Sequence, residues 1–147
     1  MARIKYGQIG VGHAHASKIG VYRKSSDYEV VGVVEKDPVL RKRYEGNGAY
    51  KDLKWMTQEQ LLNVPGLQVV GVETRVGDLL NTAATCVAAG KHIHLDKPAG
   101  ENLKDFKQLL DEVASRKLHL QMGYIYRYQT AFQFCYKAVA EGWLGDI

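Results

Sequence analysis

Two glycines and two histidines stand close together near the start of the chain, in the stretch YGQIGVGHAHASKIG at residues 6–20. Gly10-Val11-Gly12 follows an apolar run, and a loop between a strand and a helix can hold a phosphate on its backbone N–H groups. His13 and His15 carry imidazoles, which are common ligands of transition metals. The stretch therefore predicts either a pyrophosphate site or a metal site.

The phosphate interpretation has support elsewhere in the sequence. Gly10 permits a tight turn, and Gly12 has no Cβ to keep the backbone away from a phosphate. His15 occupies the place of the third glycine in the G-x-G-x-x-G pattern, which weakens the pattern. Glu35 ends the next apolar run about 20 residues later, where an acid accepts hydrogen bonds from ribose hydroxyls. We predict a dinucleotide site that favours NAD, with NADP kept open because Lys36 tolerates a ribose phosphate.

The metal interpretation has less support from the sequence. No carboxylate or thiol cluster stands beside His13 and His15, and histidines two positions apart at a helix start are expected to point to different sides. We therefore expect no metal. One ring is expected to donate a hydrogen bond to a phosphate or to line the cofactor groove. The alternative is a partly exposed polar residue without such a role.

A second group, Asp96-Lys97-Pro98, stands in the stretch AGKHIHLDKPAG directly after another apolar run. Pro98 biases Lys97 toward an extended conformation, which fixes the direction of the ammonium group. A lysine beside an apolar nicotinamide face would lose hydration and its pKa would fall, so it could share a proton with a substrate hydroxyl or carbonyl. The alternative is a surface lysine in a turn.

Regular alternation of apolar runs and helical patterns places these groups. Strands rich in Val, Ile and Leu are predicted at 3–9, 29–35, 67–73, 91–95 and 118–123, with a weaker one near Ala49 and Tyr50. Helices are predicted at 14–25, 38–45, 58–63, 76–89 and 103–115. Strands that are apolar on both faces and alternate with helices are typical of a covered parallel sheet. The prediction is an α/β fold with a doubly wound, Rossmann-like parallel sheet.

The composition narrows the class of protein. The 147 residues suffice for one domain, and 46% hydrophobic with 24% charged residues is typical of a soluble globular chain. No apolar run reaches the roughly 20 residues that span a bilayer, so we expect a cytoplasmic protein without a membrane partner. The net charge of +4 is modest, and the RKR cluster at 41–43 is expected to be a solvated face rather than a nucleic-acid site. Cys86 and Cys135 are expected to be small core residues.

The last part of the chain follows a different pattern. Tyr128, Phe132, Cys135 and Val139 fall on one helical stripe, which gives residues 124–147 a wide apolar face. We expect a dinucleotide-binding domain at 1–123, followed at 124–147 by a linker helix and the start of a truncated second domain. The apolar helix also offers a possible surface for homo-oligomer formation.

The loop GQIGVGHAH, Glu35, AGKHIHLDKPAG and GYIYRYQTAF leading to GWLGDI together resemble the amino-terminal part of the Gfo/Idh/MocA oxidoreductases. The resemblance covers almost the whole chain. It implies an NAD(P)-binding domain, with Lys97 near the nicotinamide to orient or protonate a substrate oxygen, and a cis peptide before Pro98. The family motif is usually Glu-Lys-Pro, and here Asp96 replaces the glutamate.

Two departures from the family pattern bear on function. Relatives often have Thr-Pro after the fourth strand and a histidine in the next helix, whereas this chain has Thr74-Arg75 and Leu79. Thr74 can still contact the cofactor, but Arg75 alters the groove wall. The family's second domain, which supplies further catalytic residues, would start about where the sequence ends.

The resemblance implies hydride transfer between a nicotinamide and a sugar- or polyol-type hydroxyl, with an incomplete active site in these 147 residues. Whether the chain is itself an enzyme is therefore left open. The alternative function is a non-catalytic dinucleotide-binding or assembly module that docks through its C-terminal helix. The sequence does not determine the substrate, the direction of reaction or the oligomeric state.

Overall fold

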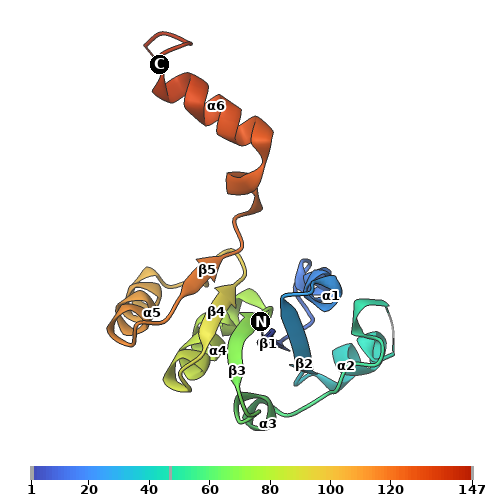
Figure 1. The fold of residues 1–147 in the computed structure, drawn as a ribbon. Helices are drawn as coiled ribbons and strands as arrows, with labels where there is room; N and C mark the ends of the chain where they lie inside the picture. The colour runs from blue at the N-terminus through green and yellow to red at the C-terminus, as the bar shows by residue number, and fades with distance from the viewer. Residues whose placement is uncertain (1, 47, 147) are drawn as a thin grey trace.

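One parallel sheet organises the chain, whose computed structural model describes residues 2–46 and 48–146 (Figure 1). Five strands lie in the order β2-β1-β3-β4-β5, and every neighbouring pair is parallel. Their bounds are Ile4–Ile9 for β1, Tyr28–Val34 for β2, Leu67–Val72 for β3, His92–Leu95 for β4 and Leu120–Met122 for β5. The predicted doubly wound, Rossmann-like sheet is confirmed.

Helices connect the strands, and several begin at capping residues that the sequence provides. Asp37 accepts hydrogen bonds from the first N–H groups of α2, Asn102 does so for α5, and Thr57 forms a capping box with Gln60 at α3. The α-helices are α1 (Ile19–Lys24), α2 (Pro38–Tyr44), α3 (Gln58–Leu62), α4 (Val76–Ala88), α5 (Leu103–Ser115) and α6 (Thr130–Ala140). Short 3₁₀ turns occupy Ala16–Lys18, Gly48–Tyr50 and Ile125–Tyr128.

Two hydrophobic clusters cover the sheet. Tyr6 belongs to the smaller cluster, with residues of α1 and β2, whereas Ile9 belongs to the larger one, with residues of α3, α4 and α5. Successive side chains of a strand point to opposite faces, so these two residues of β1 place the clusters on opposite faces of the sheet. Burial on both faces explains why the strands are apolar throughout and why the sheet is parallel.

The predicted strand near Ala49 and Tyr50 is wrong. These residues lie in a 3₁₀ turn that begins at Gly48, whose φ is +51°, and Tyr50 is buried in the smaller cluster. The chain becomes extended only later, where Trp55 forms an isolated parallel bridge with Val33 of β2. Packing of the tyrosine ring into the core, rather than pairing of its backbone, therefore sets the conformation of this segment.

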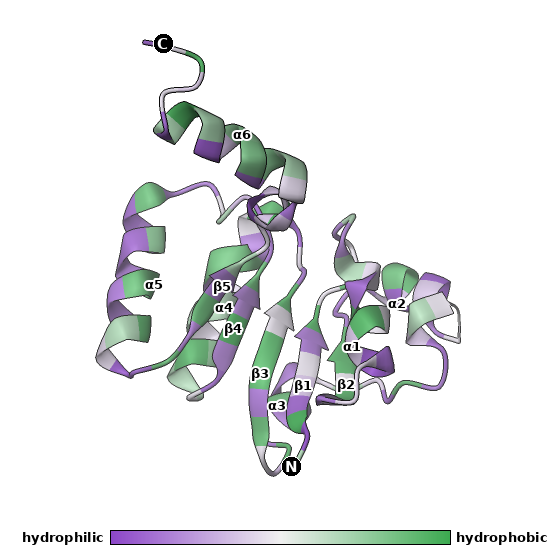
Figure 2. Cartoon of the chain, turned by 45° about the horizontal axis from the view of Figure 1, so that its top comes forward, coloured by the Kyte–Doolittle hydropathy of each residue, from purple (hydrophilic) through white to green (hydrophobic). Residues whose placement is uncertain are grey.

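The C-terminal helix α6 stands away from the sheet (Figure 1), and Figure 2 shows hydrophobic colour along it. Phe132 and Phe134 are 53% and 59% exposed, and Ala138 is its buried residue. Cys86 is buried as expected, but the expectation of a buried Cys135 is wrong, because Cys135 is exposed on α6, whose main contact is with the 3₁₀ turn at Ile125–Tyr128. Among the described residues, no helix combines the length and apolar character needed to cross a bilayer.

Candidate functional site

The glycine loop, residues 10–15, leaves the carboxyl end of β1 in a conformation that requires glycine at its first position. Gly10 has a φ of +95°, and a Cβ placed there would lie 2.5 Å from the carbonyl of Glu73 on the neighbouring strand end. A side chain at Gly12 would come within 3.2 Å of Leu40. The loop therefore passes close to the end of β3 and to α2.

The helix expected from Ala14 begins later. Ala16 N–H donates to the carbonyl of His13 and Lys18 N–H to that of His15, which makes a 3₁₀ turn, and α1 starts only at Ile19. With six residues, α1 contributes a smaller dipole at the loop than a long helix would. Backbone N–H groups, rather than the helix dipole, are what this loop offers a ligand.

Those N–H groups divide into two sets. Val11 N–H donates to Glu35 Oε2 at 2.9 Å, and Glu35 Oε1 accepts from the N–H of Asp37 at 2.9 Å. The N–H groups of residues 12–14 donate no hydrogen bond within residues 2–46 and 48–146. The predicted acid is thus tied to the loop, and the adjacent amides are free to bind an anion.

A cavity of about 440 Å³, here called the glycine-loop groove, lies at the carboxyl ends of β1, β2 and β3. At its rim the Arg75 guanidinium lies 3.5 Å from Asp37 Oδ2. Leu79, at the position where relatives often have a histidine, is buried in the larger cluster. The predicted site residues that line the groove are Gly10, Gly12, Glu35, Lys36, Thr74 and Arg75.

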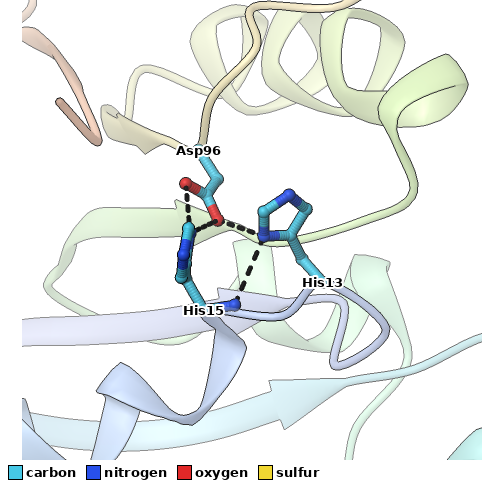
Figure 3. Close-up of side chains that lie close together, drawn as sticks. All are labelled: His13, His15 and Asp96. Carbon is cyan, nitrogen blue, oxygen red and sulfur yellow. Dashed lines mark hydrogen bonds and ion pairs between the residues drawn. The ribbon is translucent and has the colours of Figure 1, made fainter.

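The other predicted site residues lie outside this groove. Val11 is buried in the smaller cluster, while Lys97 and Pro98 are exposed and joined by a cis peptide bond, as the family resemblance implies. His13, His15 and Asp96 lie together on the other side of the loop (Figure 3). The structure therefore divides the predicted residues between two places.

The two histidines point to the same carboxylate (Figure 3), so the expectation that they point to different sides is wrong. His13 Nδ1 contacts Asp96 Oδ2, and His15 Nδ1 lies 3.3 Å from the same oxygen. The expectation assumed helical geometry, but the loop is still turning at these positions. Asp96, at the end of β4, supplies the carboxylate that the local sequence lacks.

A buried ion pair lies beside them. Lys18 Nζ is 2.5 Å from Glu73 Oε1, and the Glu73 side chain has no exposed surface. We refer to His13, His15, Lys18, Glu73 and Asp96 as the buried charge cluster. The three charged side chains among them stand at the ends of β3 and β4 and in the 3₁₀ turn, so the sheet edge holds them together.

The two carboxyl groups of this cluster titrate apart. Burial raises the pKa of Glu73 to about 8, although Lys18 pulls the value down. Burial also acts to raise the pKa of Asp96, but the Glu73 side chain, the Lys97 N–H and Lys18 together hold it below its ordinary value. Adjacent carboxyl groups commonly divide in this way, because one proton relieves the repulsion between them. Glu73 is the group that carries that proton.

A second cavity of about 450 Å³ borders the cluster and shares no lining residue with the glycine-loop groove. His94 lies on its wall, with Nδ1 2.6 Å from the Tyr22 hydroxyl, and burial lowers the pKa of His94 to about 4. His15 and Asp96 also line this cavity, together with Met122 and Tyr128. The cluster is therefore reachable from a pocket of its own.

Sequence reasoning missed Lys18, Glu73 and His94. Glu73 could have been predicted from the sequence, because it is an acid at the end of an apolar run, as Glu35 and Asp96 are, and so falls on the same edge of the predicted sheet. Lys18 could not have been predicted from the sequence, because its contact with Glu73 depends on the late start of α1.

Comparison with known proteins agrees with the fold and the loop. Residues 4–124 match the family model described as "Oxidoreductase family, NAD-binding Rossmann fold" (Gfo/Idh/MocA). The chain is 26% identical to trans-1,2-dihydrobenzene-1,2-diol dehydrogenase of Macaca fuscata fuscata over 153 residues, 98% of this chain and 43% of that protein. It is also 26% identical to myo-inositol 2-dehydrogenase of Thermotoga maritima over 148 residues, 97% of this chain and 42% of that protein.

Among solved structures, scyllo-inositol dehydrogenase from Lactobacillus casei, with bound NAD(H) and scyllo-inositol, superposes with a TM-score of 0.80 at 20% identity. The match covers 99% of this chain and 43% of that one. The chain thus spans less than half the length of the relatives it matches. Its sheet order, its glycine loop and the match over residues 4–124 lead to one conclusion: the chain belongs to the Gfo/Idh/MocA oxidoreductase family, of which it contains the NAD-binding Rossmann domain.

Proposed function

We propose that the glycine-loop groove binds NAD and that the chain is the cofactor-binding part of a dehydrogenase acting on a polyol-type hydroxyl. The free backbone N–H group of Gly12, which lines the groove with the Glu35 carboxylate, carries this proposal, and the free N–H groups of His13 and Ala14 follow it in the loop. Amides of this kind suit a pyrophosphate, and an acid at the end of the second strand suits a ribose.

The groove fits such a cofactor on both counts. Each Glu35 oxygen accepts one backbone hydrogen bond at 2.9 Å, so each keeps a lone pair for a ribose hydroxyl. A ribose phosphate at the same place would face the carboxylates of Glu35 and Asp37, and Lys36 would offset only part of that repulsion. We therefore expect NAD to bind more tightly than NADP.

The proposed chemistry is transfer of a hydride between a nicotinamide and the carbon that bears the hydroxyl. Lys97 is exposed at the edge of the sheet, where it could hold the proton of that hydroxyl. Relatives are more than twice as long, and we propose that 1–123 forms the cofactor domain and 124–147 leads toward further catalytic residues. Binding with little turnover is expected from residues 1–147 alone, because positioning contributes roughly 7–11 kcal/mol to such reactions.

Calorimetric titration of the chain with NAD and with NADP tests the proposal. Glu35→Ala should lower the affinity for NAD by about tenfold, the effect of one charge-assisted hydrogen bond. Glu101→Ala, a change of an exposed acid after β4, is the matched control and should leave the affinity unchanged. Equal NAD binding by the wild type and Glu35→Ala would place the cofactor elsewhere.

The exposed apolar side chains of α6 favour a second candidate function, a dinucleotide-binding assembly module. Phe132, Phe134 and Tyr136 are all more than half exposed. Light scattering should then give a mass that rises with protein concentration. A mass of one chain at every concentration would contradict this candidate.

A further inference from the structure

We infer that His13, His15 and Asp96 form a binding site for a divalent transition-metal ion, distinct from the proposed NAD groove. One ring nitrogen of each histidine and one carboxylate oxygen of Asp96 lie within 4.8 Å of one another. Figure 3 shows the two rings on either side of the carboxylate. Nothing in the proposed NAD chemistry uses this arrangement.

The separation of His15 and Asp96 is close to that of two ligands on one metal ion, whereas His13 contacts Asp96 more closely than two such ligands do. His15 Nδ1 lies 3.3 Å from Asp96 Oδ2, and His13 Nδ1 contacts the same oxygen from the other side. Ligands bound at about 2.0–2.2 Å around one ion are roughly 3–3.5 Å apart. Small rotations of the two imidazoles would therefore bring all three ligand atoms around one ion.

The buried Oδ2 oxygen of Asp96 faces the two imidazoles. Asp96 Oδ1 accepts the Lys97 N–H at 2.8 Å, whereas Oδ2 lies against the ring nitrogens of His13 and His15 and accepts no well-aligned hydrogen bond from the part of the chain that the structure describes. The Asp96 side chain is only 1% exposed, so water does not compensate freely for that absence. An ion held between Oδ2 and the ring nitrogens would satisfy this oxygen.

The remaining members of the buried charge cluster are compatible with a cation. Lys18 Nζ lies 2.5 Å from Glu73 Oε1 and 3.9 Å from Asp96 Oδ1, the oxygen that also accepts the Lys97 N–H. Glu73 Oε2, 4.0 Å from His13 Nδ1, adds a second carboxyl oxygen on the side of the rings. The lysine charge is thus directed mainly at Glu73, which leaves Asp96 to the metal.

The donor set indicates which ions would bind. Two imidazoles and one carboxylate suit Zn²⁺, Co²⁺ and Fe²⁺, whereas Mg²⁺ and Ca²⁺ prefer oxygen ligands. Three protein ligands leave further coordination positions, and the cavity of about 450 Å³ that His15 and Asp96 line gives a small molecule access to them. The site would therefore take an oxygen of water or of a small ligand.

Titration of the whole chain with Co²⁺, without any dinucleotide, tests the inference. We expect one ion per chain with a visible d–d absorption, displaced by stoichiometric Zn²⁺. Asp96→Asn and His15→Gln should each weaken Co²⁺ binding by at least about tenfold, since even the loss of an outer partner of a ligand costs 10–100-fold. His15 is 41% exposed, so His15→Gln is expected to fold even where a change at Asp96 does not.

The matched control is the double variant His92→Gln/His119→Gln, which removes a histidine pair of similar spacing, with ring centroids 5.3 Å apart, from another part of the sheet. This variant should bind Co²⁺ as the wild type does. Absence of Co²⁺ absorption in the wild type, or equal binding by wild type and His15→Gln, would overturn the inference. Glu35→Ala should keep the Co²⁺ signal, so failure of the NAD proposal and failure of the metal site give different results.

Discussion

The two sides of the glycine loop handle charge in opposite ways. In the glycine-loop groove, Arg75 and Asp37 form an ion pair of 3.5 Å with side chains 73% and 36% exposed. In the buried charge cluster, the Lys18–Glu73 pair is 2.5 Å long and its side chains are 22% and 0% exposed. Water screens the first pair and leaves its members free to meet a ligand, whereas burial keeps water from the second pair, raises the pKa of Glu73 and makes each partner costly to lose. We therefore expect changes to the groove residues to affect dinucleotide binding. Changes to the residues of the buried charge cluster should affect the free energy of unfolding and its dependence on pH.

The largest expected effect is at Gly10, because this residue joins the two sides. Gly10→Ala would place a Cβ 2.5 Å from backbone atoms of Glu73 and Thr74 at a φ of +95°. Rigid backbone must move and an L-residue must adopt an unfavourable conformation, so we expect a loss of about 4 kcal/mol in the free energy of unfolding. Urea denaturation measures this loss.

Gly90→Ala separates the two causes, since Gly90 has a φ of +72° and no atom within 4 Å of the added Cβ. Backbone strain alone should cost it about 1 kcal/mol. Similar losses for the two variants would show that the loop does not pack on the end of β3.

A smaller effect is expected from Glu73 and depends on pH. A carboxyl group whose pKa is raised from 4.5 to about 8 on folding binds more protons in the folded state, so stability falls as the pH rises from 4.5 through 8. Glu73→Gln removes this loss. Between pH 5 and 9 the variant should gain on the order of 3 kcal/mol relative to the wild type.

Denaturation curves at several pH values give this difference, and Glu101→Gln, in which the acid is exposed, should show none of it. A Glu73→Gln profile parallel to that of the wild type would mean that Glu73 is ionised throughout and paired with Lys18.

His94 should act at acid pH. Burial lowers its pKa from 6.5 to about 4, so the folded state binds fewer protons, and its contribution to stability is lost as the pH falls from 6.5 to 4. His94→Asn keeps an acceptor for the Tyr22 hydroxyl but does not titrate. The wild type should lose about 2 kcal/mol more than this variant over that range, after allowance for partial exposure.

The same comparison with His119→Asn, a change of an exposed histidine, serves as the control. If the wild type and His94→Asn lost stability equally in acid, burial beside Tyr22 would not lower the pKa of His94.

The smallest effect is expected in the groove. Arg75→Ala breaks the exposed pair with Asp37, and its free energy of unfolding should change by less than about 0.5 kcal/mol. Asp37→Ala, by contrast, should cost about 1 kcal/mol because Asp37 caps α2 through the N–H groups of Val39 and Leu40. Thermal denaturation of both variants measures the difference, and an Arg75→Ala loss as large as that of Asp37→Ala would show that the groove charges are also structural.

Local sequence patterns were sufficient to predict the sheet and about half of the site residues. Apolar runs bounded by turns predicted the five strands, and the acid after the second of them predicted a side chain that the structure places against the glycine loop. These features depend on hydrophobic periodicity and on residues close in sequence, so they can be predicted without knowledge of the tertiary structure. The strand predicted near Tyr50 was wrong. Packing of Tyr50 against core residues that are distant in the sequence, rather than local propensity, fixes the conformation of that turn.

Residue order alone predicts the parallel sheet, the tight turn at Gly10 and the acids at strand ends, because hydrophobic periodicity, glycine positions and the alternation of elements can be seen without the fold. The contacts of His13 and His15 with Asp96, a residue 81 positions away from His15, and of Lys18 with Glu73 became apparent only in the folded chain. Such contacts depend on where a helix starts and on which strand ends lie side by side. The pKa shifts and the proposed ion binding that result from these contacts depend on burial. No single segment of the sequence specifies which side chains are buried.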